Sequence, residues 1–319
     1  MAVYTHIDKK DIAQFLSRYD AGELTSFKGI AEGVENSNFL IQTSEGKYIL
    51  TVYEKRVSEQ ELPFFTGLMD HLSHKSIPCP SPIKDRKGNA LQTLKGKPAA
   101  MVSFLKGDSV KNIKTIHCRE VGRALAEMHL ATEGFKHSRI NSMGVQNWRK
   151  IFDSCKAKMD AVEKGVAAEL ENCLERIESH WPKRLPAGVI HADLFPDNVF
   201  FLEDTLSGMI DFYFACNDFF AYDIAVCLNS WCFEGKTEFN ITKARHMLSA
   251  YDEVRPFSEE ERNALPVLAS GAALRFLLSR LYDWLNQVEG AMVTPKDPKE
   301  YLKKLRFHMQ VKSAAEYGL

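Results

Sequence analysis

The chain has 319 residues, which is enough for two lobes that each enclose a core of their own. Charged residues make up 26% and hydrophobic residues 45%, and the formal net charge of −1 argues against a basic surface for nucleic acid. The N-terminus has no positive segment ahead of an apolar core, and no run of about 20 apolar residues follows, so we expect neither a signal peptide nor a membrane span.

The seven cysteines favour a reducing compartment. They stand at positions 79, 118, 155, 173, 216, 227 and 232, and none forms a Cys-x-x-Cys pair. An odd number without paired spacing is typical of buried free thiols, so we expect a cytoplasmic protein without disulfides or a zinc site. His71 and His74 lie three residues apart on a predicted helix, but no third ligand is nearby, and a solvated or capping role is favoured over metal binding.

The first third of the chain is predicted to alternate strands with turns after an opening helix near residues 8–19. Residues 29–43 are predicted to form two strands joined by a tight turn. The turn and its flank contain Gly33, Asn36, Ser37 and Asn38. Turn-tolerant residues let backbone N–H groups point at an anion, which makes this a candidate phosphate-binding loop. Such turns are also common, so an ordinary hairpin turn is the alternative.

The next predicted elements are a strand, a helix and an extended, proline-rich connector, at residues 47–54, 58–74 and 77–83. An apolar strand then covers residues 99–105, and a polar Lys-Gly-Asp-Ser stretch ends it. We place a domain boundary there, which gives domains of residues 1–105 and 106–319. From residue 116 onward apolar residues recur at helical spacing, and residues 145–179 are predicted to form a helix pair.

The most informative stretch contains His191, Asp193 and Asn198 in a His-x-Asp-x-x-x-x-Asn loop. A short apolar strand follows the loop, then a polar turn at residues 203–208, and a second short strand ends just before Asp211. If the two strands pair antiparallel, Asn198 and Asp211 meet at the same open end. This is the arrangement that phosphoryl transfer from ATP requires.

Each residue of this loop has a predicted role. The amide oxygen of Asn198 and the carboxylate of Asp211 are hard donors that suit Mg²⁺ carrying ATP phosphates. Asp193 is predicted to face the substrate and to accept the proton of an attacking hydroxyl. His191 is predicted to support the loop. Taken singly, such residues are most often turn and cap residues, and only their combined spacing favours the catalytic interpretation.

A helix is predicted from residue 267 to 287. Its apolar stripe consists of Leu274, Leu278, Leu281 and Leu285. Arg275 borders this stripe, and its guanidinium either extends to solvent or binds a planar anion such as a carboxylate. Arg280, about one turn later, is the second candidate for such an anion site.

These motifs resemble those of the aminoglycoside phosphotransferase and choline kinase branch of the protein-kinase-like fold, which carries a small residue after the histidine, here Ala192. The chain is further similar, nearly end to end, to the bacterial homoserine kinases of that branch. The similar segments are residues 1–5, 29–39, 48–54, 191–198 and 274–281. The resemblance implies an α+β, bilobal fold with an N-terminal antiparallel sheet lobe that includes a helix and a larger, mainly helical C-terminal lobe.

The resemblance also implies further site residues. The turn near Gly33 would cover the ATP phosphates, and Ser103 and Phe104 at the hinge between the lobes would bind the adenine through their backbone. Asp223 would brace the catalytic loop, although an ordinary first-turn helix acid is an equally good interpretation. Thr51 takes the place of the third-strand lysine that usually contacts the phosphates, as it does in the similar family. Nearby cations are Lys47, Lys55 and Arg56, and none is assigned that role.

The activity implied is ATP- and Mg²⁺-dependent phosphorylation of the L-homoserine hydroxyl to O-phospho-L-homoserine, a step toward threonine, by a cytoplasmic enzyme with no nucleic-acid or membrane partner. Arg275 and Arg280 would bind the substrate. A sister kinase for an aminoglycoside, choline or methylthioribose would share every catalytic residue and is the main alternative. A nucleotide-binding pseudokinase is a weaker one, because such proteins usually lose Asp193, Asn198 or Asp211, and all three are present.

Overall fold

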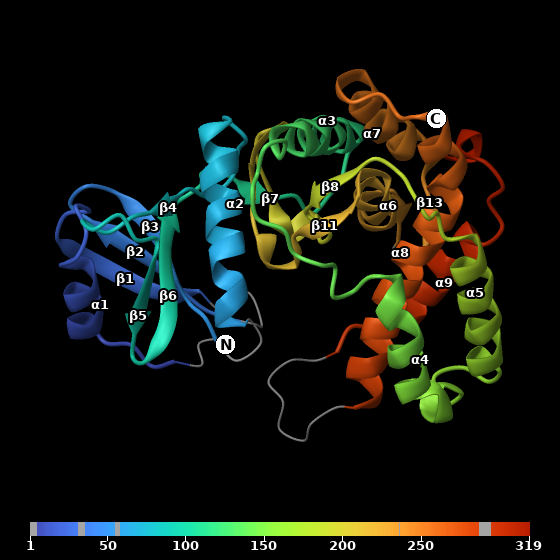
Figure 1. The fold of residues 1–319 in the computed structure, drawn as a ribbon, viewed down its shortest axis with the longest axis horizontal. Coiled ribbons are helices and arrows are strands. Elements are labelled where there is room, and N and C mark those ends of the chain that lie inside the picture. The colour runs from blue at the N-terminus through green and yellow to red at the C-terminus, as the bar shows by residue number, and fades with distance from the viewer. Residues whose placement is uncertain (1–4, 31–35, 55–57, 236, 287–294) are drawn as a thin grey trace. The chain divides into compact units, whose positions relative to one another are not determined.

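The computed structural model describes residues 5–30, 36–54, 58–235, 237–286 and 295–319 (Figure 1). It divides into two compact units, and each is described by itself. The first unit comprises Met1–Gly107, Gly134–His137 and Ser207–Tyr213. The second comprises Asp108–Glu133, Ser138–Leu206 and Phe214–Leu319. The sequence boundary after residue 105 lies close to the end of the longest segment of the first unit.

The first unit is built around an antiparallel, six-stranded sheet (Figure 1). In spatial order its strands are β1 (Leu24–Ile30), β2 (Ser37–Thr43), β3 (Lys47–Val52), β6 (Lys97–Ser103) and β4 (Pro82–Ile83), and β5 (Leu91–Leu94) also pairs with β6. The register places Thr51 opposite Asn38 on one side and opposite Ala100 on the other. Thr51 occupies the strand position where a lysine was expected, and its neighbours in the sheet, Asn38 and Ala100, come from distant parts of the sequence.

Two helices complete the first unit. Helix α1 (Lys9–Leu16) begins with a capping box formed by Asp8 and Asp11. Its apolar face, with Phe15 at the centre, joins the buried core residues of the sheet. Helix α2 (Leu62–His74) follows a 3₁₀ turn (Glu59–Glu61), so the helix predicted at residues 58–74 is confirmed except in its first turn.

The second unit is mainly helical. Its helices are α3 (Thr115–Ala131), α4 (Val145–Met159), α5 (Val166–His180), α6 (Phe220–Trp231), α7 (Ile241–Val254), α8 (Glu259–Leu285) and α9 (Lys299–His308). Its short strands are β7 (Asp108–Ser109), β8 (Ala187–Ile190), β9 (Val199–Leu202), β11 (Cys216–Phe219), β12 (Phe233–Glu234) and β13 (Glu238–Phe239). Strand β10 (Thr205–Met209) begins in this unit and belongs to the first unit from Ser207 onward. Strand β8 pairs with β11, and β9 lies between β10 and β7. The helix pair predicted at residues 145–179 is confirmed as α4 and α5.

The turn between β9 and β10 is shorter than the sequence suggested. The predicted turn of residues 203–208 shrinks to Glu203 and Asp204, and Thr205 to Gly208 belong to β10. Glu203 has a φ of 55°, in the left-handed region that a two-residue hairpin turn uses. The polar composition of residues 203–208 therefore concealed a strand.

Helix α8 is the central helix of the second unit and packs against α4, α5, α6 and α9. It begins eight residues before the predicted start of 267, at a capping box formed by Ser258 and Glu261. By length and composition α8 could cross a membrane, but 67% of its most apolar window is buried inside the protein. The apolar stripe of Leu274, Leu278 and Leu281 is buried, as expected of a core helix.

Helices α3 and α7 approach each other closely at Gly122. A Cβ added there would lie 2.1 Å from the carbonyl oxygen of Met247, so only glycine permits this contact. The close approach brings His129, near the end of α3, within hydrogen-bonding distance of Tyr251 of α7. His129 also lies 3.0 Å from Asp223 Oδ2, and Asp223 binds the backbone of the loop that carries the predicted catalytic residues.

Candidate active site

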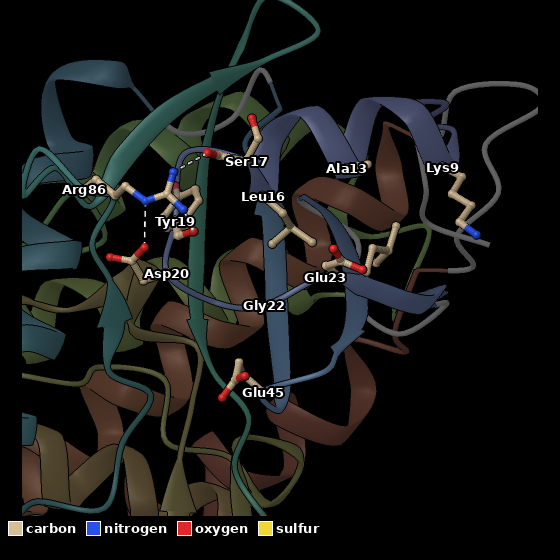
Figure 2. A pocket seen from close by; sticks show the side chains of 11 residues that line it. Lys9, Ala13, Leu16, Ser17, Tyr19, Asp20, Gly22, Glu23, Glu45 and Arg86 are labelled. Carbon is tan, nitrogen blue, oxygen red and sulfur yellow. Dashed lines mark hydrogen bonds and ion pairs between the residues drawn. The ribbon is translucent and has the colours of Figure 1, made fainter.

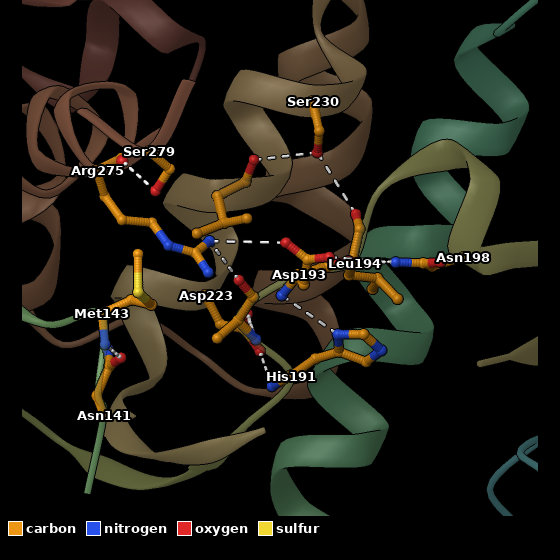
Figure 3. Close-up of polar contacts among 12 residues, drawn as sticks. Asn141, Met143, His191, Asp193, Leu194, Asn198, Asp223, Ser230, Arg275 and Ser279 are labelled. Atoms are coloured by element: carbon orange, nitrogen blue, oxygen red, sulfur yellow. Dashed lines mark hydrogen bonds and ion pairs between the residues drawn. The ribbon is translucent and has the colours of Figure 1, made fainter. Parts of the chain in front are cut away.

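Residues 191–198, called here the 191–198 loop, follow strand β8 and are held by the first turn of α6 (Figure 3). The carboxylate of Asp223 accepts hydrogen bonds from the backbone N–H groups of His191, at 2.7 Å, and Ala192, at 2.8 Å. Asp223 is fully buried. Its carboxylate therefore fixes the backbone immediately before Asp193.

A buried histidine completes the surroundings of Asp223. His129 Nε2 lies 3.0 Å from Asp223 Oδ2, and His129 Nδ1 lies 2.7 Å from the Tyr251 hydroxyl. Burial lowers the pKa of His129, so its neutral ring donates to Asp223 and accepts from Tyr251. Burial alone would raise the pKa of Asp223, but hydrogen bonds from His129 and the backbone hold it below its ordinary value. Asp223 is therefore ionised.

The end of α6 holds the loop on the other side of Asp193. The carbonyl oxygen of Leu194 accepts a hydrogen bond from Trp231 Nε1 at 2.8 Å, and Ser230 Oγ and Cys227 Sγ lie 3.4 and 3.8 Å from it. Trp231 is fully buried. One helix thus positions the backbone before and after Asp193.

Arg275 of α8 contacts the same loop from a third direction (Figure 3). Its Nη1 donates to the carbonyl oxygen of Ala192 at 2.9 Å and lies 3.7 Å from Asp193 Oδ1. Its guanidinium packs on the ring of Phe276, 4.0 Å from the centroid, and the side chain is only 4% exposed. Ala192 has a φ of 63°, a conformation that costs energy for a residue with a Cβ and that these contacts maintain.

The surroundings of Asp193 raise the pKa of its carboxyl. Burial raises the pKa of its carboxyl, and the charges of Arg275, His191 and Lys296 act in the opposite direction. Asn198 Nδ2 donates to the Asp193 carbonyl oxygen at 2.8 Å and lies 3.4 Å from Oδ2. Because the amide nitrogen of Asn198 makes this contact, its amide oxygen is the atom that remains available to bind a cation.

Asp211 follows β10 and belongs to the first unit. It is exposed, with a φ of 63°. Two residues later the Tyr213 hydroxyl donates to the hydroxyl of Tyr53 at 3.2 Å, which ties this segment to the residue that follows β3. Because Asn198 belongs to the second unit, its meeting with Asp211 stays a prediction.

Comparison with known proteins identifies the family. A model described as the phosphotransferase enzyme family matches residues 26–257, more than half of the chain. The chain belongs to the phosphotransferase enzyme family. It is 59% identical to a homoserine kinase of Rhizobium etli and 58% identical to one of Rhodospirillum rubrum, in each case over 100% of this chain and 99% of the relative.

Solved structures show the fold of this phosphotransferase. Spectinomycin phosphotransferase in complex with ADP and spectinomycin has a TM-score of 0.67 at 14% identity, over 98% of both chains. Choline kinase from Cryptosporidium parvum has a TM-score of 0.67 at 16% identity, over 95% of both chains. The predicted α+β, protein-kinase-like fold is confirmed.

The residues predicted to bind the nucleotide lie in the first unit of the phosphotransferase. Gly33 is outside the described residues. The side chain of Asn36 accepts from the Glu54 N–H at 3.2 Å, and Ser37 Oγ donates to Glu54 at 2.8 Å. Ser103 Oγ accepts from the backbone of Ser81 at 2.9 Å. These side chains stabilise the sheet, so contacts to a nucleotide would come from their backbone.

Thr51 makes a neutral contact where many kinases have a lysine. Its hydroxyl donates to Asn38 Oδ1 at 2.8 Å. The ammonium of Lys47 lies 5.7 Å from the centroid of the Phe104 ring, at the end of the sheet where β3 begins and β6 ends. Lys55 and Arg56 lie outside the described residues, and the phosphate-binding cation stays unassigned.

The two arginines predicted to bind the substrate have different surroundings. Arg275 lies beside Asp193, as described above. Arg280 Nη1 lies 2.9 Å from Glu300 Oε2 and 3.1 Å from the Asp297 carbonyl oxygen, and its guanidinium packs on the Tyr301 ring. Arg280 therefore holds the start of α9 and makes no described contact with the 191–198 loop.

Sequence reasoning missed several residues that hold this loop. His129 and Trp231 were not singled out, because an apolar helix face gives no sign that one polar atom on it has a distant partner. Lys296, whose charge acts on Asp193, also carried no signal in the sequence. Each of these relations joins segments that are remote in the chain.

A cavity of about 830 Å³ lies in the first unit, between α1 and the turn that joins β2 to β3 (Figure 2). Lys9, Glu23 and Glu45 line it, and Arg86 pairs there with Asp20 at 2.7 Å. None of the predicted site residues contributes to it. Its mixed charges and mutual pairing indicate a solvated surface hollow.

Proposed function

We propose that this phosphotransferase is a homoserine kinase, which transfers the γ-phosphate of ATP to the hydroxyl of L-homoserine and produces O-phospho-L-homoserine. The observation that carries the proposal is the 58–59% identity to homoserine kinases over the whole chain. The loop geometry supports it, since Asp223, Trp231 and Arg275 hold the backbone on both sides of Asp193.

Asp193 is proposed to act on the acceptor hydroxyl. Its carboxylate would accept the hydrogen bond and then the proton of the hydroxyl as the oxygen attacks the γ-phosphorus. Asp223, His191 and Trp231 would hold the loop still during this step. Rigid positioning matters because small displacements of a reacting group lower the rate steeply.

Asn198 and Asp211 are proposed to hold Mg²⁺. The amide oxygen of Asn198 is the atom that its contact with Asp193 leaves available, and a carboxylate with an amide oxygen suits this ion. When bound, Mg²⁺ neutralises charge on the ATP phosphates. Backbone groups of residues 33–38 are proposed to contact the phosphates, and those of Ser103 and Phe104 the adenine.

Arg275 and Arg280 are proposed to serve the acceptor side of the site. Arg275 would set the position and charge of Asp193, and Arg280 would hold the segment that precedes α9. Their direct binding of the substrate carboxylate stays a prediction. The enzyme is proposed to be cytoplasmic and to supply a precursor of threonine.

The test is ADP release from Mg-ATP with L-homoserine, beside L-serine, L-threonine, choline and an aminoglycoside. We expect kcat/KM to be highest for L-homoserine by at least tenfold, because a pocket built for one small zwitterion rejects analogues that leave its polar groups unpaired. Preference for choline or an aminoglycoside would identify a sister kinase. Absence of turnover with all five would contradict the kinase proposal.

A further inference from the structure

Lys296 lies three residues before the start of α9 at Lys299. Its ammonium is 6.0 Å from the centroid of the Phe195 ring, which belongs to the 191–198 loop. The side chain is exposed, and within the described part of the chain no hydrogen bond or ion pair engages its ammonium. A cation thus stands free beside the loop that carries Asp193.

The backbone that follows Lys296 is anchored by hydrogen bonds. The carbonyl oxygen of Asp297 accepts a hydrogen bond from Arg280 at 3.1 Å, and Asp297 Oδ1 accepts one from the Lys299 N–H at 2.8 Å. Glu300 Oε1 accepts from Lys304, which also donates to the Asn229 carbonyl oxygen at the end of α6. The charged cluster of α8 and α9 therefore fixes the point from which the Lys296 side chain extends.

The ring of Phe195 lies between Lys296 and the side chains that surround Asp193. Phe195 follows Asp193 by two residues, and its ring packs edge-on against Phe276, at 4.9 Å between centroids. Phe276 in turn carries the guanidinium of Arg275 on its face. Burial raises the pKa of the Asp193 carboxyl, and the positive charge of Lys296 acts in the opposite direction, as does that of Arg275.

The cations around this loop differ in what they can bind. Arg275 is 4% exposed and donates to the loop carbonyl, and Arg280 is paired with Glu300. Lys304 is buried between Glu300 and a carbonyl oxygen. Among these groups Lys296 alone combines exposure with an ammonium that has no described hydrogen-bond or ion-pair partner, and its one described contact is with the Phe195 ring.

We propose that Lys296 binds the carboxylate of the amino-acid acceptor, an inference that rests on the proposed function. Three carbon atoms separate the homoserine hydroxyl from its carboxylate, so a molecule whose hydroxyl faces Asp193 carries its only anionic group a few ångströms away. Removing a carboxylate from water is costly without a cationic partner. A lysine ammonium on a flexible stem meets this need without a fixed geometry.

The experiment compares two acceptors that differ only in the carboxylate. 3-Amino-1-propanol has the hydroxyl, carbon chain and ammonium of homoserine and lacks the carboxylate. In Lys296→Ala we expect kcat/KM for L-homoserine to fall by about tenfold, mainly through KM, as for loss of one charge-assisted hydrogen bond. The value for 3-amino-1-propanol and KM for ATP should stay within twofold of wild type. Lys296→Arg should restore at least part of the loss.

Lys299→Ala is the matched control, since it removes an exposed lysine three residues away whose side chain has no role in the proposal. It should leave kcat/KM for both acceptors unchanged.

Two outcomes would overturn the inference. An equal loss of kcat/KM for both acceptors in Lys296→Ala would place Lys296 on the transferred phosphate, and no loss for either acceptor would show that Lys296 does not bind the carboxylate. If wild type turns over no L-homoserine, the proposed function and this inference both fail. If wild type does and Lys296→Ala matches it, only the inference fails.

Discussion

The 191–198 loop has two sides of very different character. On its buried side, Asp223, Trp231 and Arg275 each bind backbone atoms of the loop and are shielded from solvent. On its open side are the partly exposed Asp193 and the exposed Lys296. The difference shows that one set of groups holds the loop in place, while another set is available to bind and act on a ligand. Buried polar groups require permanent partners and so fix geometry, whereas exposed charges can exchange water for a ligand.

Replacement of Asp193, on the open side, should have the largest effect. Asp193→Asn keeps the size of the side chain but removes the proton acceptor, so kcat should fall by about two to four orders of magnitude. ATP affinity, measured by nucleotide titration, should be nearly unchanged. Wild-type turnover of this variant would remove Asp193 from the chemistry.

The proposed metal ligands should come next. Asp211→Ala should abolish productive Mg-ATP binding, because a carboxylate contributes the charge that holds the ion. Asn198→Ala should weaken binding and raise the Mg²⁺ concentration needed for half-maximal activity. The measurement is initial rate against Mg²⁺ concentration. If Asp211→Ala kept the wild-type dependence on Mg²⁺, the predicted hairpin placement would be wrong.

Replacement of Arg275 tests whether a buried residue sets the pKa of the open-side residue Asp193. Arg275 lowers the pKa of Asp193, so Arg275→Met should raise it, and the carboxylate should form only at higher pH. The acid limb of the profile of kcat/KM against pH should therefore move to higher pH, with about a tenfold loss in kcat/KM at neutral pH. Arg280→Met, the control, should keep the wild-type acid limb. An unshifted limb in Arg275→Met would mean that its charge does not act on Asp193.

Tyr251→Phe should have the smallest effect and should separate the two sides most clearly. It removes the hydroxyl that donates to His129, which costs about 1 kcal/mol of stability and lowers Tm by about 2–4 °C. We expect kcat to fall several-fold while KM for homoserine is unchanged, the reverse of the Lys296→Ala pattern.

Tyr317→Phe is the matched control for that variant, since it removes a hydroxyl 2.8 Å from the buried His308, which makes no described contact with the loop. It should lower Tm by a similar amount with kcat unchanged. Equal kcat in the two variants would show that the hydrogen bonds from Tyr251 through His129 to Asp223 stabilise the fold without positioning the loop.

The sequence by itself determined the features that depend on local order. The spacing of Asp193, Asn198 and Asp211 along one loop and hairpin predicted phosphoryl transfer, because residues so close in the chain have few ways to be arranged. The strand and helix types followed from periodicity, as for α4 and α5. The start of β10 at Thr205 was missed, because a polar strand at a tight turn has the composition of a loop.

Only the tertiary structure decided which distant groups serve the loop. Arg275 lies 83 residues from the carbonyl that it binds, and His129 lies 94 residues from Asp223. Sequence pattern shows which helix face is buried, but it cannot show which polar atom on that face meets which partner, since this depends on how the helices pack. For the same reason no sequence pattern indicated that Lys296 lies near the 191–198 loop. That placement follows from the anchoring of α9 to α8 by Arg280 and Glu300.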